Sequence, residues 1–340
     1  MMRLVPLKHY IIPVFIPQEA CPHRCIFCNQ VKISGHTSLP SIEEVSATIS
    51  RHLSTIPHQN RHVEIGFFGG SFTGMAIDRQ EQFLKVAAAF VDTGQVDGIR
   101  ISTRPDYIDN RRLDLLRKYG VGTVELGAQS MDDIILKKSG RGHTAADTVR
   151  ASEQVRQQGF ELGLQMMIGL PGDTLEASLI TARRIIALGA SNTRIYPTLV
   201  IKDTPLERLY LSGKYVPLRL EEAVTWSKML YLVFEAARVI VIRMGLHPSE
   251  GLISGEDLIA GPFHPSFREL VMTELWREEL EKIESGNDAK TLTVFVSPGH
   301  LNFAIGYKAS NRLMLLKRYD RVNFVTDFSL EGRSYHVDYR

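Results

Sequence analysis

The stretch Cys21-Pro-His-Arg-Cys25-Ile-Phe-Cys28 holds all three cysteines of this 340-residue chain. An odd number of cysteines this close together does not build the disulfide framework of a secreted protein, so the cluster indicates a reducing compartment and a metal or redox site. The spacing lets three thiolates from one loop converge on one metal centre. A four-iron cluster with one iron open to a ligand fits three thiolates. A structural zinc ion is the alternative, with His23 or His36 as its fourth ligand.

Around this loop, short runs rich in Val, Ile and Phe alternate with longer stretches of helical period. The pattern predicts repeated βα units around a parallel sheet. We expect strands at 11–16, 63–68, 98–102, 123–127, 162–168 and 193–199. We expect helices at 42–53, 80–91, 111–118, 145–158 and 175–188.

About six βα units are fewer than a closed eightfold barrel needs, so the fold class is α/β with an open, partial (β/α)6 barrel. The working face of such a sheet lies at the carboxyl ends of its strands. Polar and glycine-rich segments occur there, at 68–71, 102–106, 127–130 and 169–172, and the cysteine loop follows the first strand. A zinc knuckle needs no such glycine-lined sheet, so this setting favours an iron–sulfur cluster over zinc.

Beyond the barrel, a helix at 220–237 and an apolar run at 239–246 extend the core, and a Gly- and Pro-punctuated connection covers 247–264. A helix at 267–283 leads to a strand at 292–296, a short helix near Leu301, a helix at 311–319 and strands at 322–328 and 335–339. We therefore predict two domains, a core at 1–255 and a small α/β domain at 256–340. Gly306-Tyr-Lys-Ala309 lies between two of its helices and is similar to the backbone-clamping loop of a KH module, except that Ala309 replaces the second glycine. A cap that closes the barrel mouth is the alternative.

The overall charge is +2, from 40 Lys and Arg against 38 Asp and Glu, and predicts neither a nucleic-acid nor a membrane partner. Residues 289–340 are mildly basic, with eight Lys and Arg against four Asp and Glu. No stretch approaches the roughly 18 uninterrupted apolar residues of a membrane helix. With no targeting segment at the N-terminus either, we expect a cytoplasmic protein.

The cysteine spacing and the strand-end residues resemble the radical S-adenosylmethionine superfamily over the first two hundred residues or more. The resemblance implies that Cys21, Cys25 and Cys28 hold a [4Fe–4S] cluster whose open iron binds S-adenosylmethionine. It further implies reductive cleavage to a 5′-deoxyadenosyl radical, which abstracts hydrogen from the substrate. Such chemistry also needs an electron donor such as a flavodoxin or ferredoxin.

The first set of cofactor contacts implied by this resemblance lies in the first half of the barrel. Phe27 matches an aromatic residue that packs near the adenine. Gly69, Gly70 and Ser71 match the glycine motif that binds the methionine amino group, where Ser71 departs from the more usual Glu. Ser102 matches a cofactor-contacting side chain at the end of the third strand.

The second set lies further along the sheet. Gln129 and Gln165 match ribose-contacting positions. Arg141 matches an arginine that pairs with the methionine carboxylate, for which a planar guanidinium is well shaped. Ile168 and Gly169 match the backbone beside the adenine. Each residue alone has an ordinary structural explanation, and only their joint placement with the cysteines indicates a cofactor site.

A finer resemblance is to the elongator catalytic-subunit family, which modifies wobble uridine in transfer RNA. It rests on Ser102-Thr-Arg-Pro-Asp106, Glu125-Leu-Gly-Ala-Gln-Ser130, Arg141-Gly-His143, Arg194-Ile-Tyr-Pro-Thr-Leu-Val-Ile-Lys202 and Gly213-Lys-Tyr215. That family carries an acetyltransferase domain after its radical core, whereas 57 residues follow Ile283 here. The resemblance thus implies a stand-alone relative and puts acetyl-CoA use in doubt.

The sequence fits three functions. The first is a radical enzyme acting on RNA, in which Tyr196 relays an electron or proton and Arg104 and Lys202 hold a phosphate or carboxylate of the substrate. The second has the same chemistry but a small metabolite as substrate, as in the oxygen-independent coproporphyrinogen dehydrogenases. The third is a non-catalytic RNA-binding protein with a zinc or degenerate cluster site.

Overall fold

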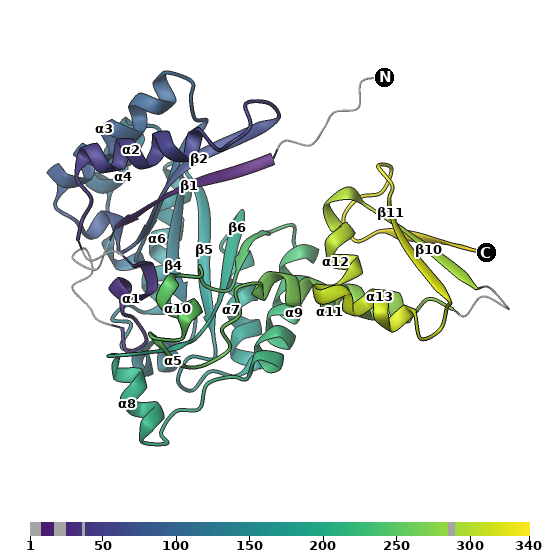
Figure 1. Cartoon of the computed structure of the whole chain (residues 1–340). Helices are drawn as coiled ribbons and strands as arrows, with labels where there is room; N and C mark the ends of the chain where they lie inside the picture. Colours follow the sequence, from purple (N-terminus) through teal and green to yellow (C-terminus); the bar gives the residue numbers. More distant parts are fainter. Residues whose placement is uncertain (1–7, 17–24, 36–37, 285–289) are drawn as a thin grey trace.

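The computed structural model of the chain describes residues 8–16, 25–35, 38–284 and 290–340. Its larger part is a curled sheet of seven parallel strands in chain order, with β1 and β8 at the two edges (Figure 1). The strands are β1 (Lys8–Ile16), β2 (Arg61–Gly69), β3 (Gly98–Thr103), β4 (Val121–Gln129), β5 (Glu161–Ile168), β6 (Asn192–Pro197) and β8 (Ile240–Met244). The prediction of a partial barrel is confirmed, and its seventh strand is the apolar run predicted at 239–246.

A helix connects each pair of neighbouring strands. These helices are α2 (Ile42–Leu53), α3 (Ile77–Asp92), α4 (Asn110–Lys118), α6 (Ala145–Gln157), α7 (Leu175–Ala187) and α9 (Leu220–Ala236). At the start of α2, Ser41 accepts from the Glu44 backbone while the Glu44 side chain accepts from the Ser41 backbone. Thr144 and Asp147 form the same reciprocal box at α6. Both boxes satisfy backbone N–H groups that the first turn leaves without partners, so these two helices begin where the sequence predicts.

The strands have one apolar face and one that lines the barrel interior. On β4, Val124, Leu126 and Ala128 are buried in the hydrophobic core, whereas Gly127 and Gln129 line an internal cavity. Side chains alternate between the two faces of a strand, so residues two apart on β4 share the interior. The apolar faces of the sheet and of the helices therefore form the core outside the barrel, and its interior is free for chemistry.

Several short elements were not predicted from the sequence. They are α1 (Gln30–Ser34), α5 (Asp133–Lys138), α8 (Pro205–Leu211), α10 (Glu250–Ser254), β7 (Val200–Ile201) and β9 (Leu258–Ala260). Each is too short to show a hydrophobic period of its own. Helices α5 and α8 nevertheless support the cysteine loop, as described below.

A helix shared by two cores joins the barrel to the C-terminal unit (Figure 1). Helix α11 (Phe267–Glu281) packs Val271 and Leu275 into the barrel core and Trp276 and Leu280 into a second core. The second core lies under β10 (Thr291–Val296), α12 (Leu301–Ile305), α13 (Ser310–Leu315), β11 (Arg321–Thr326) and β12 (Tyr335–Tyr339). Strand β10 pairs in parallel with β11 and antiparallel with β12. The domain boundary at residues 255/256 stays a prediction.

The loop between α12 and α13 contains the stretch that was compared with a KH module. Lys308 and Ala309 there have positive φ values of 52° and 58°. The Tyr307 backbone N–H donates to Thr273 Oγ1 of α11 at 2.8 Å, which ties the loop to the shared helix. The KH-like role stays a prediction. In the part of the chain that the structure describes, no helix is long and apolar enough to cross a membrane.

Candidate functional site

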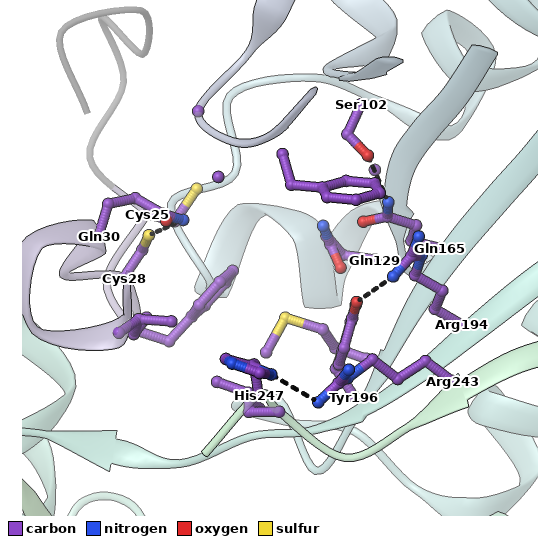
Figure 2. Close-up of a pocket in the computed structure, with 18 of the residues that line it drawn as sticks. Cys25, Cys28, Gln30, Ser102, Gln129, Gln165, Arg194, Tyr196, Arg243 and His247 are labelled. Atoms are coloured by element: carbon purple, nitrogen blue, oxygen red, sulfur yellow. Dashed lines mark hydrogen bonds between the residues drawn. The ribbon is translucent and has the colours of Figure 1, made fainter. Parts of the chain in front are cut away.

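A cavity of about 460 Å³ opens at the carboxyl ends of the barrel strands (Figure 2). It is lined by residues from all seven strands and by the described part of the cysteine loop. The residues predicted from the sequence that line it are Cys25, Phe27, Cys28, Gly69, Gly70, Ser71, Ser102, Arg104, Gln129, Arg141, Gln165 and Tyr196. The strand-end residues thus converge on one cavity, as the sheet topology predicts.

Four predicted residues are not in that set. Cys21 lies outside the described residues. Ile168 is buried in the core, and Gly169 donates its N–H to Asp173 Oδ2 at 2.9 Å and accepts from the Tyr215 hydroxyl at 2.7 Å. Lys202 is exposed and lies outside the cavity lining. Their roles stay predictions.

A tight turn presents Cys25 and Cys28 to the cavity. The Cys28 backbone N–H donates to the Cys25 carbonyl at 3.1 Å, and Gln30 Nε2 donates to Cys28 Sγ at 3.3 Å. Neighbouring backbone bonds anchor the turn at both sides, because Ile26 donates to the Ser139 carbonyl beyond α5 and accepts from Leu206 of α8. The short helices thus fix the position of the thiols.

Arg141 joins the cysteines to the strand ends. Its Nη1 donates to Cys25 Sγ at 3.3 Å and its Nη2 to the Gly127 carbonyl at 2.7 Å. Its Nε is buried without a partner among the described residues, and so is Gln129 Oε1. Buried polar atoms are rarely left unpaired, so both fit a polar ligand in the cavity. We call Cys25, Cys28, Gln129 and Arg141 the cysteine side of the cavity.

Glycines make room for these side chains. A Cβ at Gly127 would lie 2.8 Å from Arg141 Nη2 and 2.9 Å from Gln129 Nε2. Gly69 has a φ of +103°, and a Cβ there would lie 2.6 Å from the Ile16 carbonyl oxygen. Only glycine fits such a backbone and such a close approach. At Gly69 the close packing of β1 on β2 is therefore sufficient to explain the glycine, whatever binds beside it.

The barrel interior beneath the cavity is charged rather than apolar. Glu125 of β4 is fully buried and accepts from Arg100 Nη1 at 2.8 Å, from Arg194 Nε and Nη2 at 2.7 and 2.9 Å, and from Gln165 Nε2 at 2.8 Å. Burial would raise the pKa of Glu125, but the Arg194 and Arg100 cations outweigh it and hold the pKa below its usual value. Glu125 is therefore an ionised hub. Gln165 also donates to Ser102 Oγ at 2.8 Å (Figure 2). The hub therefore orients both residues.

Glu64 of β2 extends this charged interior toward the amino ends of the strands. It accepts from Arg100 and, at 2.6 Å, from His9 Nε2. Sequence reasoning assigned no role to Glu64, Arg100, Glu125 or Arg194. The available signal was a charged residue at an alternate position of an otherwise apolar strand.

The opposite wall of the cavity comes from β6 and β8. Arg194 Nη1 lies 3.5 Å from the Tyr196 hydroxyl. Arg243 and His247, which the sequence analysis did not select, line the cavity beside Tyr196. Figure 2 shows these residues grouped away from Cys25 and Cys28. We call Tyr196, Arg243 and His247 the β8 side of the cavity.

Two further buried groups are Arg104, which lines the cavity, and His143, which is not part of the lining. Arg104 is buried and donates to both carboxylate oxygens of Asp106, at 2.9 and 2.8 Å. His143 lies 3.2 Å from the Ala128 carbonyl oxygen. Burial, with the Arg141 and Arg104 cations, lowers the pKa of His143 to about 3, so this ring is neutral near pH 7. Arg104 as a substrate ligand stays a prediction, and its charge is balanced within the protein.

Comparison with known families gives two matches along the chain. The family described as the Radical SAM superfamily matches residues 15–185, and the family described as the Radical_SAM C-terminal domain matches residues 191–277.

Comparison with individual proteins gives distant relatives. The chain is 28% identical over 253 residues to a tRNA uridine(34) acetyltransferase of Methanocaldococcus jannaschii, covering 63% of this chain and 47% of that protein. It is 31% identical over 184 residues to human Elongator complex protein 3, covering 52% and 32%. The solved archaeal Elp3 of Methanocaldococcus infernus superposes with a TM-score of 0.64 at 21% identity, covering 81% of this chain and 64% of that one, and so shows a shared fold. The chain spans about half the length of the first curated relatives it matches.

Proposed function

The chain belongs to the Radical SAM superfamily, and on that premise we propose that it is an enzyme that modifies transfer RNA. Enzymes of this superfamily use a [4Fe–4S] cluster and S-adenosylmethionine. One observation carries the proposal: Cys25, Cys28, Arg141 and Gln129 meet in one cavity at the strand ends. Relatives named tRNA uridine(34) acetyltransferase support RNA as the substrate class.

The donor set of the cysteine side suits an iron–sulfur cluster. Thiolates are its usual ligands, and Arg141 Nη1 already donates to Cys25 Sγ at 3.3 Å. Cys21, outside the described residues, completes the ligand set in this proposal. The superfamily match favours iron over the zinc alternative.

The unpartnered polar atoms beside the cysteines fit S-adenosylmethionine. Arg141 Nε, a buried donor, suits the methionine carboxylate. Gln129 Oε1, a buried acceptor, suits a ribose hydroxyl. When bound, cluster and S-adenosylmethionine together supply the one-electron chemistry that removes a hydrogen atom from the substrate.

The remaining residues of the cavity position the reactants and exclude water. Gln165 and Ser102, held by the Glu125 hub, present amide and hydroxyl groups at fixed positions. Phe27, Phe68 and Met167 supply apolar walls around them. A preorganised cavity with apolar walls helps to keep a reactive species away from solvent.

Mass spectrometry of nucleosides from a strain that lacks the gene tests the proposal. We expect one modified nucleoside of transfer RNA to disappear, to return with the wild-type gene, and to stay absent with Cys25→Ala at the same protein level. An unchanged nucleoside profile in transfer RNA would contradict RNA modification. A metabolite defect alongside that unchanged profile would instead support the small-molecule alternative.

A further inference from the structure

The arginines that line the cavity differ in what balances their charge. Arg104 pairs with Asp106, and Arg194 pairs with Glu125. Arg141 lies against the Cys25 sulfur. The bonds of Arg243 go to neutral groups, from Nε to the Gly245 carbonyl at 3.0 Å and from Nη2 to His247 Nδ1 at 3.4 Å. Among the described residues of this cavity, Arg243 is thus the arginine whose charge no bonded anion or sulfur balances.

The backbone fixes Arg243 in this position. Strand β8 pairs with β6 so that Arg243 is the register partner of Arg194, and the two guanidinium groups line the same cavity. The chain then turns at Gly245, whose φ is +83° and where a Cβ would lie 2.7 Å from Phe267 Cβ. The Gly245 N–H donates to the Ile195 carbonyl at 3.0 Å. The turn that accepts from Arg243 Nε is therefore anchored to the sheet and to α11.

His247 completes the arrangement as a neutral group. Desolvation and the adjacent Arg243 cation lower the pKa of His247. A guanidinium only donates hydrogen bonds, so Nδ1 of His247 is the acceptor and the ring proton is on Nε2. The ring stands against Phe15 with centroids 6.2 Å apart. The pair thus offers N–H donors from two side chains at one place in the cavity wall (Figure 2).

A partly buried cation without an anionic partner is costly, and an oxyanion of a ligand would offset that cost. Burial lowers the pKa of Arg243, and the nearby Arg194 cation lowers it further. Tyr196 and Glu269 act in the opposite direction but do not outweigh these two effects. The Glu125 carboxylate cannot also balance the charge of Arg243, because its two oxygens already accept hydrogen bonds from Arg194, Arg100 and Gln165. The partner that fits is brought by the substrate.

We propose that Arg243 and His247 form an oxyanion subsite on the β8 side, at which a phosphate of the RNA substrate binds during modification. This rests on the proposed function, since RNA supplies the phosphate. The planar guanidinium donates to two phosphate oxygens, and His247 Nε2–H donates to a third position. Bound there, the phosphate sets the distance between the nucleotide and the cysteine side of the cavity.

Salt-dependent binding of transfer RNA to the full chain tests the subsite, because each neutralised phosphate releases counterions. For Arg243→Gln we expect affinity about tenfold weaker at low salt, as befits one charge-assisted contact, and a log–log salt slope smaller by about 0.7–0.9. Arg243→Lys keeps the slope because it keeps the charge. Arg238→Gln, an exposed arginine just before β8, is the matched control and leaves both quantities unchanged.

A second arm identifies the group that Arg243 binds. The dinucleotide UpU and its neutral methylphosphonate analogue are titrated against the same proteins, and we expect only UpU to lose affinity in Arg243→Gln. Equal losses for both, equal losses in Arg238→Gln, or no loss at all would overturn the subsite. The result is independent of the nucleoside profile: normal nucleosides with Arg243-dependent phosphate binding would refute transfer RNA modification while leaving the phosphate subsite standing.

Discussion

The cysteine side and the β8 side of the cavity are built in different ways. On the cysteine side, Arg141 and Gln129 pack closely against Gly127, and Arg141 donates to the Cys25 sulfur. Arg141 Nε and Gln129 Oε1 are buried there without a partner among the described residues. On the β8 side, Arg243 donates to the Gly245 carbonyl and to His247, so no bonded anion balances the Arg243 charge. The difference is expected if, as proposed, the first side binds a defined cofactor and the second binds an anionic group of a substrate.

Removing a thiol acts on the cysteine side alone and has the largest expected effect. Cys25→Ala leaves too few thiolates for the cluster, so iron and sulfide after anaerobic reconstitution should fall to background. Arg243→Gln, on the β8 side, should retain the full iron content. Iron retained at the wild-type level in folded Cys25→Ala would break the division between the two sides.

Neutralising the hub beneath both sides should destabilise the barrel. Glu125→Gln leaves the buried Arg194 and Arg100 cations without their shared carboxylate, and breaking a buried ion pair costs about 3–5 kcal/mol. Urea unfolding measures this loss, with the exposed Glu153→Gln of α6 as control. A loss of unfolding free energy no greater than that of the control would show that the barrel does not depend on the buried Glu125 carboxylate.

The buried His143, at the Ala128 carbonyl, should make stability depend on pH. Its pKa is about 3 in the folded chain and about 6.5 in an unfolded one. The unfolded chain therefore binds the extra proton as the pH falls below 6.5, and stability is lost. Between pH 7 and pH 5 the loss is about 2 kcal/mol. His143→Gln should remove that part of the pH dependence, whereas the exposed His58→Gln should keep it. Parallel curves for wild type and His143→Gln would contradict a buried neutral ring.

The smallest expected effect tests the packing of the cysteine side. Gly127→Ala places a methyl group against Arg141 and Gln129, and overpacking of this kind costs about 1–3 kcal/mol. Activity should fall about tenfold. Gly122→Ala on the same strand is the matched control, since its nearest atom, the Ile99 carbonyl oxygen, lies 4.0 Å away. Equal activity in the two variants would show that a methyl group at position 127 does not displace Arg141 or Gln129.

The sequence predicts the cysteine side better than the β8 side, for physical reasons. Hydrophobic periodicity marked β1 to β6 and the starts of α2 and α6, and a compact cysteine motif marked the site. Arg243 lies in an apolar run of sequence. That its charge has no bonded anion becomes visible only in the fold, where Arg194 and Arg104 pair with the Glu125 and Asp106 carboxylates. The Glu125–Arg194 pair spans 69 residues of chain, so only the folded sheet brings its members together. Helices α5 and α8 were missed because, at six and seven residues, they are too short to show a hydrophobic period.

In the proposed function, the cysteine side binds S-adenosylmethionine at an iron–sulfur cluster. Electron paramagnetic resonance of the reduced, reconstituted full chain tests it most directly, before and after S-adenosylmethionine is added. We expect a [4Fe–4S] signal that changes on addition in the wild type and in Arg243→Gln, and changes far less in Arg141→Gln. Stoichiometric zinc without iron, or a cluster signal that S-adenosylmethionine leaves unaltered, would rule out this cofactor site.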